Sequence, residues 1–136
     1  MDTERIKKLV KVAKMYYEDN MNQSEIAKAI GVSPELILAL MYTESRFDMK
    51  ALSPTKQYKG LMQTPWASKE YADVDVLYGA RILEEKMKSS HARKPNGVDM
   101  RTAIAMYKGG LSRQAFSQAD EVLRLYNTLR TLKEAV

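Results

Sequence analysis

The stretch "SPELILALMYTES", residues 33–45, carries both a clear helix start and an unusually apolar composition. Serine followed by proline is typical of a helix N-cap and the first helical position, so Ser33 is expected to cap this helix. The side chains that follow are mostly large and apolar, which predicts a core helix that ends near Ser45. One charged residue shares its apolar face, because three- and four-residue steps connect Ile37, Leu40, Met41 and Glu44.

Glu44 is therefore the first candidate for chemistry. Burial disfavours a charged carboxylate and raises its pKa, which is how proteins make a general acid usable near neutral pH. The alternative is a half-exposed glutamate at a helix end that pairs with Arg46 or with a lysine. Position along the helix leaves both interpretations open.

Working outward, apolar periodicity and capping signals predict an all-α chain. Between residues 48 and 68 the sequence has Pro54, Gly60 and Pro65 but no period, and a long irregular segment in a compact domain is often functional. No strand is predicted, and "SSHARKPNG" is expected to be a loop. Besides the helix just described, helices are predicted over residues 3–19, 23–30 (ended by Gly31), 73–88, 99–107 and 117–134.

The amino-acid composition limits which classes of function are possible for the chain. The chain has 136 residues, 45% of them hydrophobic, which suits one domain, residues 1–136, with a real core. There is no cysteine and a single histidine, His91, which excludes structural zinc sites and cysteine nucleophiles. The net charge of +5 favours anionic partners such as nucleic acid, acidic lipid or a bacterial wall. Neither a signal peptide nor a membrane span is recognisable, so synthesis in the cytoplasm is expected.

Four blocks carry a family resemblance: "ESRFDMKALS" (44–53), "GLMQ" (60–63), "DVLYGARIL" (75–83) and "AMYKGG" (105–110). In this order they resemble the motifs of the soluble lytic transglycosylase family, which is related to goose-type lysozyme and has a helical, lysozyme-like fold. The resemblance covers roughly residues 32–110. It implies cleavage of the β-1,4 bond between N-acetylmuramic acid and N-acetylglucosamine in peptidoglycan. Glu44 would be the single acid/base, with 1,6-anhydromuramic ends as products and no metal or organic cofactor.

The same resemblance implies a set of residues that bind the glycan. Ser45 would orient the site, Ser53 would hydrogen-bond the sugar or the glutamate, and the hydroxyl of Tyr107 would lie near the catalytic carboxyl. The implied substrate-binding residues are Ser45, Ser53, Gly60, Leu61, Met62, Gln63, Tyr107 and, from the last helix, Tyr126. Two departures stand out: a lengthened "PTKQYK" before Gly60, and Lys108 where the family has asparagine, which is expected to alter subsite contacts.

Other residues leave alternatives open. A second carboxylate would make the enzyme a hydrolase, and Asp48, Glu70, Asp73 and Asp75 are candidates, although solvated loop or cap roles explain each of them. Trp66 and Tyr71 either stack on a sugar face or simply pack.

Two other function classes compete. "QSEIAKAIGVS" (23–33) is similar to the start of a helix-turn-helix, but the following helix offers apolar rather than polar side chains to base edges. A catalytically inactive wall-binding module would keep the fold and lose the chemistry. The sequence as a whole predicts a lytic transglycosylase that acts as a monomer on peptidoglycan, binds no nucleic acid, and reaches the wall in association with phage or by another export route.

Overall fold

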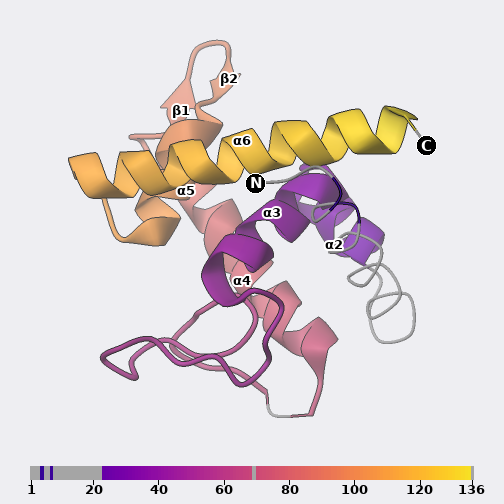
Figure 1. The fold of residues 1–136 in the computed structure, drawn as a ribbon. Helices are drawn as coiled ribbons and strands as arrows, with labels where there is room; N and C mark the ends of the chain where they lie inside the picture. The colour runs from indigo at the N-terminus through magenta and orange to yellow at the C-terminus, as the bar shows by residue number, and fades with distance from the viewer. Residues whose placement is uncertain (1–3, 5–6, 8–22, 69, 136) are drawn as a thin grey trace.

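The computed structural model describes residues 4, 7, 23–68 and 70–135. The described residues form five helices and one small hairpin, so the predicted all-α class is confirmed (Figure 1). The predicted helix over residues 3–19 lies outside the described residues. The elements are α2 (Gln23–Ile30), α3 (Pro34–Ser45), α4 (Ala72–Met87), β1 (Arg93–Lys94), β2 (Gly97–Val98), α5 (Met100–Lys108) and α6 (Arg113–Ala135).

Helix α3 is the centre of the core. Every residue from Leu36 to Tyr42 is buried, so the helix has no face in solvent along this run. The 23-residue α6, about 35 Å long, lies across α3 and also packs against α5, while α2 packs against both α3 and α4 (Figure 1). Because α3 is enclosed, it cannot enter a groove of DNA, and the helix-turn-helix interpretation of residues 23–45 fails.

The end of α2 and the two ends of α3 agree only in part with the capping residues expected from sequence. Gly31 has a φ of +78° and ends α2, as predicted for a glycine just past a helix. Ser33 takes the extended conformation of an N-cap residue, but its side chain makes no capping hydrogen bond. Its buried Oγ has no hydrogen-bond partner among the described residues. At the other end, Arg46 and Phe47 are both left-handed, and the amide of Arg46 donates to the carbonyl of Tyr42.

The hairpin within residues 89–99 is a correction to the predicted loop. Arg93 pairs with Val98 and Lys94 pairs with Gly97, with a two-residue connection between them. Strands of two residues are too short to show alternation in sequence, although the Asn96–Gly97 pair is a turn signal. Helix α6 also begins at Arg113 rather than near Ser117.

The irregular segment between α3 and α4 packs closely against α4 at two glycines. Gly60 has a φ of +76°, and a Cβ there would lie 2.7 Å from Ala67 Cβ and 3.0 Å from Asp75 Oδ2. A Cβ on Gly79 of α4 would lie 2.5 Å from Met62 Cβ. Both glycines therefore let the "GLMQ" turn, residues 60–63, sit directly on α4.

We expect Gly60→Ala to destabilise the protein more than Gly31→Ala. Both residues have positive φ, which costs an alanine about 1–2 kcal/mol. A Cβ at Gly31 meets nothing within 4 Å, whereas the crowding at Gly60 adds about 1–3 kcal/mol. Urea unfolding of the two variants measures the difference, and equal losses would show that the contact with Ala67 and Asp75 is not tight.

Candidate active site

Glu44 lies in the last turn of α3, and its side chain is 14% exposed. The ammonium group of Lys108, the last residue of α5, lies 2.5 Å from Glu44 Oε1. The same Nζ donates a hydrogen bond of 2.8 Å to the hydroxyl of Thr43. Helices α3 and α5 are thus joined by a nearly buried ion pair.

The environment of Glu44 acts on its pKa in two opposite directions. Burial raises the pKa, while the charge of Lys108 and its hydrogen bond lower it. Burial is the larger effect, so the pKa of Glu44 lies above its ordinary value. Each of the two interpretations of Glu44 from sequence therefore holds in part: the carboxyl is desolvated, and it pairs with a lysine. Arg46 is not the partner, since its guanidinium lies 4.3 Å from the centre of the Tyr42 ring.

Glu44 opens on a pocket of about 500 Å³. Its walls come from the end of α3, the irregular segment, one face of α4 and the end of α5. This volume is within the range of small-ligand sites. The lining residues are Glu44, Ser53, Tyr58, Gln63, Pro65, Ile82, Glu85, Lys86, Met106, Tyr107, Lys108 and Gly109.

The wall beside Glu44 is built by Tyr107 and the "GLMQ" turn. The hydroxyl of Tyr107 donates a 2.6 Å hydrogen bond to the carbonyl of Met62. Burial and the nearby charge of Glu44 raise the pKa of Tyr107 well above its ordinary value, so the phenol stays neutral. Gln63 has a left-handed backbone, and its amide nitrogen donates to the carbonyls of Ala51 and Gly60. These bonds fix the shape of the wall before any ligand is present.

The structure brings together four of the site residues predicted from sequence: Glu44, Ser53, Gln63 and Tyr107 all line the pocket. The hydroxyl of Ser53 accepts a hydrogen bond from the backbone amide of Tyr58, another residue of the lining.

The other predicted residues lie elsewhere. The side chains of Leu61 and Met62 are in the core, and the amide of Gly60 donates to the carbonyl of Ala51. Within the structure, the close approach that Gly60 permits is to Ala67 and Asp75. Ser45 is buried, and its hydroxyl donates to the carbonyl of Met41. Tyr126 packs on the core from α6, beneath the guanidinium of Arg130.

Sequence reasoning missed the contribution of α4. Ile82, Glu85 and Lys86 are spaced three and four residues apart and line the pocket together. That spacing was visible in the sequence, but it is equally typical of any half-exposed helix face. Tyr58 and Pro65 complete the lining from the irregular segment.

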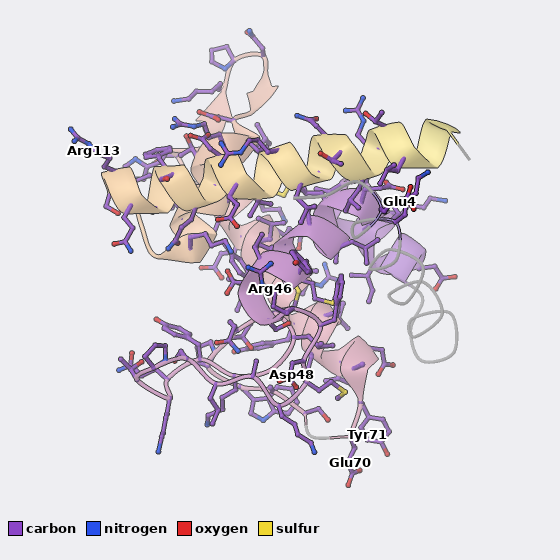
Figure 2. All side chains as sticks on the ribbon, viewed as in Figure 1. Glu4, Arg46, Asp48, Glu70, Tyr71 and Arg113 are labelled. Carbon is purple, nitrogen blue, oxygen red and sulfur yellow. The ribbon has the colours of Figure 1, made fainter. Side chains whose placement is uncertain are left out.

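The acidic residues considered as a second carboxylate do not reach the pocket. Asp48, Glu70 and Asp73 are exposed, and Figure 2 shows Asp48 and Glu70 at separate places on the irregular segment. Asp75 is 1% exposed rather than solvated, and its Oδ1 accepts from the amide of Ser68 at 2.5 Å. Burial raises the pKa of Asp75. The side chain of Asp75 binds the irregular segment to α4 through its hydrogen bond with Ser68. Glu85 is the acidic residue that does share the pocket with Glu44.

The two aromatic residues left open by the sequence are both exposed. Trp66 is 51% exposed and contacts Tyr78 edge to face, with ring centres 5.8 Å apart. Tyr71 is 60% exposed and labelled in Figure 2 at the start of α4. Neither residue lies in the core.

Within the described residues, no three acidic or histidine side chains are grouped as a metal site would require. No helix in that part of the chain combines the length and apolar character needed to cross a membrane.

The described residues form an all-α fold in which the desolvated Glu44 faces an open pocket. Residues 21–73 match the family model of the transglycosylase SLT domain. The matched residues are less than half of the chain, and the match supports a relation to the lytic transglycosylases, enzymes that act on peptidoglycan. The matched residues include α2, α3 with Glu44, and the irregular segment, but not Tyr107 or Lys108. Comparisons with curated proteins and with solved structures found no match.

Tyr107→Phe should destabilise the protein by about 1–3 kcal/mol, because the buried carbonyl of Met62 loses its donor. Urea unfolding measures the loss. Tyr78→Phe is the matched control, since Tyr78 is 39% exposed and keeps its ring contact with Trp66. A loss no larger than that of the control would mean that the Tyr107 hydroxyl does not hold the turn.

Proposed function

We propose that Glu44 is the single acid/base of a lytic transglycosylase that cleaves the bond between N-acetylmuramic acid and N-acetylglucosamine and leaves 1,6-anhydromuramic ends. The observation that carries this proposal is a carboxyl that is desolvated, has a raised pKa and opens on a pocket. The match of residues 21–73 to the transglycosylase SLT domain supports peptidoglycan as the substrate. The net charge of +5 also favours binding to a wall rich in phosphate and carboxylate.

In the first half of the reaction, protonated Glu44 donates its proton to the glycosidic oxygen. The bond from that oxygen to C1 of the muramic acid breaks, and N-acetylglucosamine leaves with a new hydroxyl. Glu44 is then a carboxylate, and positive charge develops at C1. A raised pKa keeps a larger share of Glu44 in the acid form that this step needs.

In the second half, the Glu44 carboxylate takes the proton from the C6 hydroxyl of the same muramic acid. The C6 oxygen bonds to C1 and closes the 1,6-anhydro ring. Glu44 returns to its acid form, and no water is consumed. Because the substrate supplies the nucleophile, one carboxyl group is sufficient, whereas hydrolytic glycosidases use two.

Glu85 gives a specific reason to keep hydrolysis of the same bond as a second candidate. It lies on α4 in the same pocket as Glu44, where a second carboxylate is able to activate a water molecule. The products differ, because hydrolysis adds water and leaves a reducing muramic acid.

Glu44→Gln should lower the rate of peptidoglycan cleavage by about 10²–10⁴-fold, since glutamine cannot donate the proton. Release of soluble fragments from purified peptidoglycan gives the rate, and circular dichroism checks that the variant is folded. Glu121→Gln, an exposed change on α6, is the control for loss of one carboxylate. Full activity in folded Glu44→Gln would rule out Glu44 as the acid.

Mass spectrometry of the glycan ends separates the two candidates. Wild-type enzyme should give anhydromuramic ends, and Glu85→Gln should leave that product unchanged. Reducing ends in the wild type that vanish in Glu85→Gln would instead establish hydrolysis with Glu85 as the base.

A further inference from the structure

Lys108 occupies an unusual place for a lysine at a helix end. Lysines in a last turn generally extend into solvent or interact with the last carbonyls of their own helix. The side chain of Lys108 is instead only 7% exposed and reaches across to α3. There its Nζ contacts Glu44 Oε1 at 2.5 Å and Thr43 Oγ1 at 2.8 Å, two successive residues of one helix turn.

This burial links the charge of Lys108 to that of Glu44. An ammonium ion out of water is costly unless it has acceptors for its donors and a counter-charge. Thr43 supplies a neutral acceptor that holds the Nζ in place, and Glu44 supplies the negative charge. The contact with Lys108 therefore favours the ionised form of Glu44, in opposition to the larger effect of burial.

We propose that Lys108 is a positioning residue that fixes the orientation of the Glu44 carboxyl and sets the pH range in which Glu44 carries its proton. This inference rests on the proposed function of Glu44 as the acid/base.

The effect on the two half-reactions follows from the charge. Proton donation leaves a negative charge on Glu44, and a cation 2.5 Å away is already placed to stabilise it. The cost is that the acid form is less populated at rest. Lys108 thus makes Glu44 a stronger acid whose working range lies at lower pH.

Other ionisable groups near Glu44 do not take this role. On α5, Tyr107 is neutral because burial and Glu44 both raise its pKa. On α4, Glu85 and Lys86 line the pocket with opposite charges, and Tyr58 is the ionisable residue that lines it from the irregular segment. Lys108 is the group that lowers the pKa of Glu44 by both its charge and a hydrogen bond.

The sign of the expected change is fixed by these contacts. Lys108 favours the ionised form of Glu44, so its removal raises the pKa of Glu44 further above the ordinary value. The protonated acid then persists to higher pH. In Lys108→Met, the alkaline limb of the kcat/KM profile on peptidoglycan should move to higher pH.

Two further variants separate charge from structure. Lys108→Gln keeps a hydrogen-bond donor without the charge, so it should shift the limb in the same direction, and it serves if Lys108→Met does not fold. Lys108→Arg keeps the charge and should bring the limb back toward wild type. Lys88→Met is the control, since Lys88 pairs with Glu84 on the surface of α4 at 4.0 Å and 72% exposure. An unmoved limb, or a shift to lower pH, in folded Lys108→Met or Lys108→Gln would overturn the inference.

A second measurement keeps this inference apart from the proposed function. Titration of ¹³C-labelled glutamate carboxyls by NMR follows Glu44 directly, with the signal assigned by its loss in Glu44→Gln. The Glu44 midpoint should be higher in Lys108→Met than in wild type, whether or not the preparation is active. Retained activity in Glu44→Gln would refute the acid role alone, while an unchanged midpoint in Lys108→Met would refute the role of Lys108 alone.

Discussion

The enclosure of α3 is the constraint on which the rest of the structure depends. A helix that is apolar on every side from Leu36 to Tyr42 is stable only when other elements cover all of it. Here α2 and α6 pack directly against it, and the turn at Leu61 and Met62 contributes to the same core. The polar end of α3 emerges where this cover stops, so Glu44 stands at the boundary between core and pocket. The position of the candidate acid is thus a consequence of how the core is closed.

The same contacts that close the core also shape the pocket. The "GLMQ" turn rests on α4 because Gly79 leaves room for Met62, and it is held to α5 by the hydrogen bond from Tyr107. Gln63, the next residue, faces the pocket from a left-handed backbone. A change on the core side of this turn would therefore move the pocket wall. Buried residues here influence the site although their side chains do not line the pocket.

Sequence was informative where the determining interactions are local. The bounds of α2 and α3 follow from Gly31, Pro34 and apolar spacing. The place of Glu44 on an apolar face raised the question of its role, and the family resemblance made it the candidate acid. Sequence was less informative where partners are distant along the chain. Lys108 stands out in sequence as a departure from the family's asparagine, but it lies far from Glu44 along the chain, and nothing local predicts that the two side chains pair. Sequence also did not show that the "GLMQ" turn packs Leu61 and Met62 into the core, because its apolar residues fit a ligand-binding wall and a core equally well.

The opposed influences on Glu44 explain why the site contains both burial and an ion pair. In the proposed reaction one carboxyl acts first as acid and then as base, so neither of its forms should be strongly favoured over the other. Burial alone would hold the proton too tightly for the donation step, and a solvated ion pair alone would leave too little of the acid form. Placing Lys108 inside the desolvated site sets the two effects against each other. The hydrogen bond to Thr43 also fixes the position of the Lys108 ammonium group, on the same helix turn that carries the Glu44 carboxyl.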